Sequence, residues 1–210
     1  MDTREDSVSG DVGSWRDYGP TDLPKPLAAA LEAFAERGYD GTSIREVASR
    51  SGLSVPGLYH HYPSKQALLV SLTTTVLHDL LARSRQAIAE AGPTPSEKFD
   101  AVVESLLRFH MYRREQAFVG STEIRSLDPG YHPIYIGHRI RMQRLVDDVV
   151  VAGVGEGSFT TGSPKGAARA VATMCVGVST WYRVDGPMSA DELIKQNLEF
   201  ARAIVGFRSR

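Results

Sequence analysis

Residues 57–65, GLYHHYPSK, concentrate polar ring side chains just before a proline and a lysine. Tyrosine and histidine rings carry hydrogen-bonding atoms at one edge, and lysine carries a cation. Such groups can contact the phosphates or base edges of a nucleic acid without burying a charge. A tyrosine taken alone is more often a core ring with a solvated tip. The elements around this stretch therefore decide which chemistry it performs.

The flanking residues predict two short helices joined by a tight turn. Ser43 and Glu46 have capping-box spacing at the start of the first helix, within TSIREVASR. Ser54 is the expected N-cap of the second helix, Pro56 lies in its first turn, and Pro63 ends it. Two short helices in this order indicate a helix-turn-helix, whose second helix enters the major groove of DNA.

Apolar residues recur three and four positions apart along the rest of the chain, which predicts an all-α fold. A helix is expected from about residue 25 to Gly38, and another from Ser64 towards Ala91. Five more helical stretches follow. The first two are expected at 95–118 and 121–127. The third is expected after DPGYHP, the fourth after Pro164, and the fifth from SADE onward.

Composition narrows the class of protein. The 210 residues are 42% hydrophobic and 23% charged, which is typical of a globular chain, and the net charge of −1 confines any nucleic-acid contact to a local patch. Cys175 is the only cysteine, so no internal disulfide forms and a buried, inert thiol is expected. The polar residues 1–23 predict a flexible tail and no apolar run is long enough to span a bilayer, so we expect a cytoplasmic protein without a membrane partner.

Residues 29–69, AALEAFAERGYDGTSIREVASRSGLSVPGLYHHYPSKQALL, resemble the N-terminal DNA-binding domain of the TetR family of transcriptional regulators. RGYDGTSI, EVA, SGLS, LYHHY and SK occur in the family's order and spacing. After the tail predicted at 1–23, the resemblance implies a three-helix helix-turn-helix domain at 24–70 and a helical ligand-binding and dimerisation domain at 71–210. Pro56 departs from the small or polar residue of many members, and no basic run precedes the first helix.

The resemblance also implies which residues contact a double-stranded DNA operator. Base edges are assigned to Val55, Pro56, Gly57 and His60. Val55 and Pro56 offer only apolar contacts, so His60 is the best polar reader. The remaining expected DNA-binding residues are Thr42, Arg45, Ser54, Tyr59, His61, Tyr62 and Lys65.

The C-terminal part is expected to bind a small-molecule effector and to form a homodimer. The last two helices combine small residues with an apolar stripe, as in the dimer interface of the family, although an intrachain core would give the same pattern. Bulky side chains and one arginine on the helices that surround the family's ligand cavity are candidate effector contacts, although the core is the commoner place for such apolar side chains and a solvated helix face for such an arginine. The candidates are Phe109, Tyr112, Phe118, Arg139, Met142, Met174, Trp181 and Tyr182.

One C-terminal pattern narrows the effector class. WYRVDGPMSADEL, with GEGSF and STEIRSL before it, is similar to TetR-type repressors of fatty-acid, steroid or aromatic-acid breakdown that release DNA on binding an acyl-coenzyme A thioester. The chain is thus interpreted as a ligand-responsive repressor of a palindromic operator. The alternatives are control by a protein partner and a multidrug-type repressor with a small hydrophobic effector. No acid-base set, metal-ligand cluster or cofactor motif is found, so neither an enzyme nor a cofactor is expected.

Overall fold

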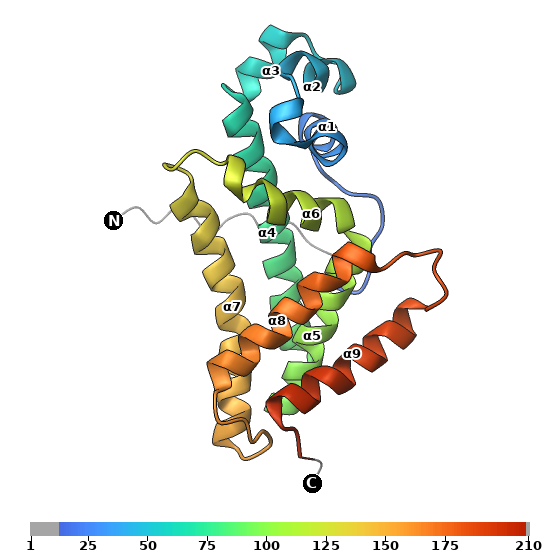
Figure 1. Cartoon of the computed structure of the whole chain (residues 1–210), viewed down its shortest axis with the longest axis vertical. Coiled ribbons are helices and arrows are strands. Elements are labelled where there is room, and N and C mark those ends of the chain that lie inside the picture. Colours follow the sequence, from blue (N-terminus) through green and yellow to red (C-terminus); the bar gives the residue numbers. More distant parts are fainter. Residues whose placement is uncertain (1–12, 209–210) are drawn as a thin grey trace.

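The computed structural model describes residues 13–208, which form nine α-helices and one short 3-10 helix. The all-α prediction is confirmed. Figure 1 shows a small head at one end of the molecule and a longer body below it. The elements are α1 (Lys25–Gly41), α2 (Ile44–Arg50), α3 (Val55–His61), α4 (Lys65–Glu90), α5 (Pro95–Tyr112), α6 (Arg114–Thr122), η1 (Glu123–Ser126), α7 (His132–Gly155), α8 (Pro164–Trp181) and α9 (Ala190–Val205).

Serine N-caps start three of the first four helices, as the sequence predicts, but the predicted capping box at Ser43 is incomplete because the Glu46 carboxylate pairs with Arg37 and Arg50. The hydroxyl oxygens of Ser43, Ser54 and Ser64 each accept a hydrogen bond from the backbone N–H three residues later. The turn between α2 and α3 passes through Gly52, whose φ of +71° lies in the left-handed region that favours glycine. Val47 and Leu58 are fully buried beneath the two helices. Local signals therefore define the helix-turn-helix.

Helix α4 joins the head to the body. Its 26 residues span about 39 Å at 1.5 Å per residue, and the helix descends from the head along the body in Figure 1. The predicted domain boundary at residue 70 falls inside this continuous helix. A change in the body can therefore reach the head through a rigid element.

The chain leaves helical geometry at Arg113, where the sequence predicts one helix through residue 118. Arg113 has φ −114° and ψ 42°, so α5 ends at Tyr112 and α6 starts in a new direction. No proline or glycine marks this break. The Arg113 guanidinium donates to the carbonyl of Gly19 at 3.0 Å and lies over the ring of Tyr18. The contacts that accompany the break are thus tertiary and invisible to local sequence signals.

The predicted tail at residues 1–23 requires correction for its second half, while residues 1–12 lie outside the described part of the chain. Trp15 is 1% exposed and packs against Ala87 and Ala101, and its Nε1 donates to Glu90 Oε2 at 2.9 Å. Arg16 forms a two-pronged ion pair with Glu104. One buried ring anchors a segment whose composition is otherwise typical of a flexible tail.

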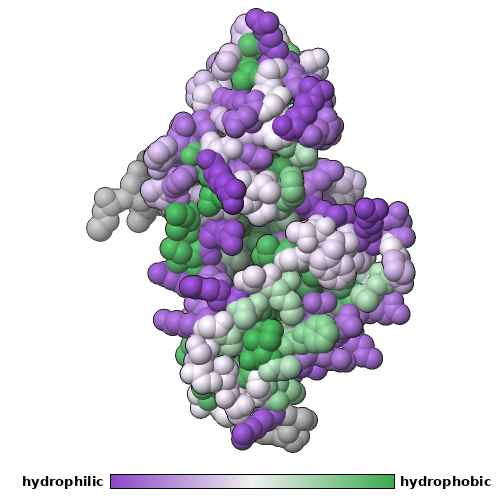
Figure 2. Space-filling model, in the orientation of Figure 1, coloured by the Kyte–Doolittle hydropathy of each residue, from purple (hydrophilic) through white to green (hydrophobic). Residues whose placement is uncertain are grey.

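Helices α8 and α9 cover the front of the body in Figure 1. Ser189 and Glu192 form the predicted capping box at the start of α9. Apolar residues gather over the lower part of this face in Figure 2. On α9, Phe200 is 52% and Ile204 37% exposed, one helical turn apart. None of the described helices is both long and apolar enough to cross a membrane.

Candidate DNA-binding surface and effector cavity

Helix α3 presents a continuous solvent-facing edge. Pro56, Tyr59 and His60 stand at positions i, i+3 and i+4 and are all exposed, while Leu58 points into the head and is fully buried. His61 is exposed beside His60, with their ring centroids 5.5 Å apart. The family-implied base readers thus include an accessible apolar residue and an accessible ring with two nitrogen atoms.

Other DNA-binding candidates flank this edge. Val55 and Gly57 are half-buried beside it, and the exposed Ser54 accepts the Gly57 N–H yet keeps its hydroxyl hydrogen for another partner. Tyr62, at the C-terminal end of α3, is half-buried, and burial raises the pKa of its hydroxyl. Arg45 is exposed on α2, and no carboxylate oxygen lies within 4 Å of its guanidinium among residues 13–208. Its cation is available for a phosphate.

Two expected phosphate contacts, Thr42 and Lys65, instead bind the head's own backbone. Thr42 is 3% exposed, and its hydroxyl contacts the carbonyl oxygens of Gly38 at 2.8 Å and Ala33 at 3.0 Å. The Lys65 ammonium donates to the carbonyls of Tyr39 at 2.7 Å and Thr42 at 3.0 Å, and lies 4.0 Å from the centre of the Tyr39 ring. These contacts close the end of α1 onto α4. In this structure both polar groups are therefore engaged within the head.

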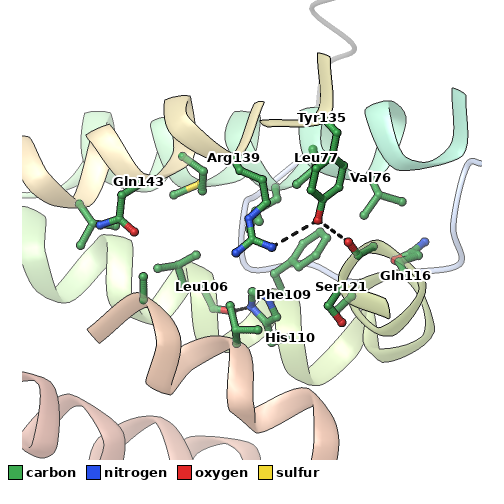
Figure 3. Close-up of a pocket in the computed structure, with 17 residues that line it drawn as sticks. Val76, Leu77, Leu106, Phe109, His110, Gln116, Ser121, Tyr135, Arg139 and Gln143 are labelled. Carbon is green, nitrogen blue, oxygen red and sulfur yellow. Dashed lines mark hydrogen bonds between the residues drawn. The ribbon is translucent and has the colours of Figure 1, made fainter. Parts of the chain in front are cut away.

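A cavity of about 90 Å³ lies in the body among α4, α5, α6, α7 and α8 (Figure 3). Its wall is mostly aliphatic and aromatic, with a few polar groups, as is usual for a small-molecule site. Three of the predicted effector contacts line it, namely Phe109, Arg139 and Met142. The polar lining residues are His110, Gln116, Ser121, Tyr135, Arg139 and Gln143.

Arg139 supplies the cavity's cation. Its Nη1 donates to the hydroxyl oxygen of Tyr135 at 3.3 Å, and that hydroxyl donates to the carbonyl of Gly120 on α6. Figure 3 shows both side chains reaching from α7 into the cavity, with Arg139 hydrogen-bonded to Tyr135. Within the described part of the chain, no carboxylate oxygen lies within 4 Å of the Arg139 guanidinium. A ligand carboxylate or carbonyl oxygen could fill that position.

His110 contributes a neutral ring to the same wall. Its Nδ1 lies 2.7 Å from the carbonyl of Leu106 and must carry the proton, since a carbonyl oxygen can only accept. The pKa of His110 is lowered to about 4, mainly by burial; the hydrogen bond to Leu106 opposes this shift, and the nearby Arg139 cation adds to it. At neutral pH the ring is uncharged, so Arg139 is the charged residue among the described residues that line the cavity.

The other predicted effector residues lie outside this cavity. Tyr112 and Phe118 line a second hollow of about 860 Å³ between α1 and the α5–α6 corner. Trp181 is 55% exposed at the end of α8, Tyr182 is buried behind it, and Met174 is half-buried on α8.

Sequence reasoning missed several lining residues. On α7, Tyr135, Arg139, Met142, Gln143 and Val146 follow helical spacing along a single face. Because Arg139 and Met142 are candidate effector contacts, this periodicity indicates that the other residues of the same face also line the cavity. His110 shares the helical face of Phe99, Val103 and Leu106 on α5, so spacing indicates its inward position as well. Gln116 has no comparable signal, because its inward position depends on the break at Arg113.

Helix α6 connects the cavity to the head. It contributes Gln116, Ala117, Gly120 and Ser121 to the cavity wall, and it also packs against α1. Figure 1 shows α6 lying directly beneath α1. The segment that follows α6 also contacts the start of α4. The Gln66 side chain on α4 donates to the carbonyl of Ser126 at 2.5 Å and accepts the Asp128 N–H at 3.1 Å. Helix α6 therefore lies between the cavity and the head.

Known proteins are similar to this chain in sequence and in fold. The HTH-type transcriptional repressor KstR2 of Mycobacterium tuberculosis is 29% identical over 195 residues, which cover 92% of this chain and 94% of the repressor. A tetR-family regulatory protein from Rhodococcus RHA1 is 28% identical with a TM-score of 0.80, over 88% of this chain and 97% of that protein. AibR, solved with isovaleryl coenzyme A and operator DNA, shares the fold with a TM-score of 0.75 at 17% identity, over 87% and 100% of the two chains.

Family assignments cover both parts of the molecule. Residues 27–72 match the bacterial regulatory proteins of the tetR family, and residues 92–205 match the tetracyclin repressor-like C-terminal domain. The first match contains the helix-turn-helix, and the second contains helices α5 to α9. The chain belongs to the TetR family of transcriptional regulators.

Proposed function

We propose that this regulator is a ligand-responsive repressor that binds a palindromic operator as a homodimer and releases it when a small molecule occupies the α4–α8 cavity. The observation that carries the proposal is the double role of α6, which lines the cavity and supports α1. A ligand that shifts α6 favours a head position unsuited to the operator. Such a ligand acts only if it binds more tightly when the head is in the position that does not fit the operator than when the head is in the position that does.

The head supplies the DNA contacts in this proposal. The exposed edge of α3, with Pro56, Tyr59 and His60, enters the major groove, and Arg45 contacts a phosphate. One head reads few bases, so two heads at half-sites about 34 Å apart are needed for specificity. Phe200 and Ile204 on α9 offer an exposed apolar face for the second protomer.

We propose an acyl-coenzyme A thioester as the effector. The cavity combines an apolar wall with the Arg139 cation, which fits an acyl chain followed by a polar carbonyl. KstR2, a repressor by name, aligns along nearly the whole chain, and AibR binds isovaleryl coenzyme A on the same fold. The small volume of about 90 Å³ supports a second candidate, a compact hydrophobic effector without coenzyme A.

The test compares Arg139→Met with Arg144→Met, an exposed arginine on the same helix that does not line the cavity. Operator binding is followed by fluorescence anisotropy while isovaleryl coenzyme A and longer acyl thioesters are added. Arg139→Met should need at least tenfold more thioester for half-release, since it loses a charge-assisted hydrogen bond. Arg144→Met should behave as the native protein. If no thioester releases the operator, or if both variants release it at the same thioester concentration as the native protein, the assignment of Arg139 to the effector site is contradicted.

A further inference from the structure

A third hollow, of about 540 Å³, lies between α4 and the segment formed by residues 13–23, called here the N-terminal strap. It meets the effector cavity at Val76 and Gln116, which line both spaces. It also meets the 860 Å³ hollow at Thr21, Arg113 and Gln116. Gln116 therefore lies between the three spaces and lines each of them, and its position is called here the junction.

The N-terminal strap is fixed to the body by polar contacts as well as by Trp15. The buried Arg83 guanidinium donates to the carbonyls of Trp15 at 3.3 Å and Asp17 at 2.8 Å. The ring of Tyr18 stacks on Tyr112 with centroids 5.2 Å apart. These contacts hold the strap at a defined place over α4, so the hollow beneath it has a built wall.

Gln116 carries the polar signal of a ligand site. The residue is 6% exposed, and its Oε1 has no hydrogen-bond partner within the described residues. A buried amide oxygen without a donor is costly and uncommon in a folded protein. Because Gln116 lines all three spaces, a ligand that displaces the atoms covering Oε1 can supply the missing N–H or O–H donor.

Arg113 places a cation at the same junction. It lines both larger hollows, and its guanidinium donates to the carbonyl of Gly19 in the strap. Between residues 13 and 208, no carboxylate oxygen lies within 4 Å of this guanidinium. Burial lowers the pKa of Arg113, and the more distant charges of Asp79 and Asp22 raise it. The side chain thus retains capacity to pair with an anion.

We propose that the polar half of the effector lies beneath the N-terminal strap. In this arrangement an amide or hydroxyl group of the ligand donates to Gln116 Oε1, and an anionic group of the ligand pairs with Arg113. The apolar half extends past Val76 into the α4–α8 cavity. This inference rests on the proposed function and deepens it, because it makes residues 13–23 the outer wall of the effector site.

The experiment measures binding to the full-length protein by calorimetry, with coenzyme A and isovaleryl coenzyme A as probes. Coenzyme A carries amides, hydroxyls and phosphates, so it represents the polar half common to all acyl thioesters. The methionine of Gln116→Met has a similar shape but no amide acceptor, so this variant should bind both probes about tenfold more weakly. Arg113→Met should lower the affinity for both probes by at least the same factor. The matched control is Gln196→Met, an exposed position on α9 that lines none of the three spaces.

If Gln116 had a purely structural role, Gln116→Met would lower the thermal midpoint of unfolding together with probe binding. The ligand-site inference predicts a different result. Gln116→Met removes an unpaired buried acceptor, so its thermal midpoint should equal or exceed that of the native protein even as probe binding weakens. Equal affinities of Gln116→Met, Gln196→Met and the native protein for the probes would overturn the inference and leave the repressor proposal intact. Gln116-dependent binding without operator release would overturn the repressor proposal alone. No binding of either probe would overturn both the inference and the coenzyme A class.

Discussion

Acidification should destabilise this regulator through His110, a buried ring in the cavity wall. Its pKa is about 4 in the folded protein and about 6.5 in the unfolded chain. Because the folded-state value is the lower one, the unfolded chain takes up the proton first as the pH falls. The stability associated with the neutral ring is complete above pH 6.5 and declines as the pH falls from 6.5 towards 4. At pH 5 the loss is about 2 kcal/mol per chain.

The assay is urea unfolding at pH 7.5 and pH 5.0, at one fixed protein concentration because dimerisation would make stability depend on it. Other titrating groups also respond to pH, so the informative quantity is the difference between the native protein and His110→Leu. The variant loses the hydrogen bond to Leu106, which lowers its stability at both pH values. It should nevertheless lose about 2 kcal/mol less than the native protein on acidification. Equal losses in the two proteins would refute the assignment of a neutral, buried His110.

Arg45→Ala should weaken binding to all DNA sequences alike and reduce the salt slope of log affinity by about one, measured by anisotropy between 50 and 200 mM salt; an unchanged slope would remove Arg45 from the phosphates. Lys65→Met should leave that slope unchanged yet lower the unfolding free energy by roughly 1–2 kcal/mol, since it loses two carbonyl contacts and a ring contact; a reduced slope would restore Lys65 as a phosphate ligand. Burial raises the pKa of Cys175 to about 12, so the native thiol should resist maleimide until urea unfolds the protein, and rapid labelling of the folded state would contradict that burial.

The sequence predicts those elements whose signals are local. Ser54, Ser64 and Ser189 mark three helix starts in the structure, because an N-cap depends on residues only three positions away. The face of α3 also follows from helical spacing, so the accessibility of Tyr59 and His60 is a consequence of Leu58 being buried.

Features set by distant contacts were not predictable in the same way. Lys65 matches the family's motif, yet its ammonium binds carbonyls near the end of α1, more than 20 positions earlier in the chain. Trp15 lies in a polar, glycine-rich stretch and is buried only because α4 and α5 present Ala87 and Ala101 to it. The cavity likewise combines residues of five helices, so its polar set emerges only from the packing.

The central claim is that effector and operator oppose one another through α6. We would measure the affinity of an acyl thioester for the free protein and for the protein saturated with operator, and the operator affinity with and without saturating thioester. Linkage requires the two ratios to be equal, and we expect a factor of at least about ten in each direction. An effector affinity unchanged by operator, together with an operator affinity unchanged by effector, would contradict the account.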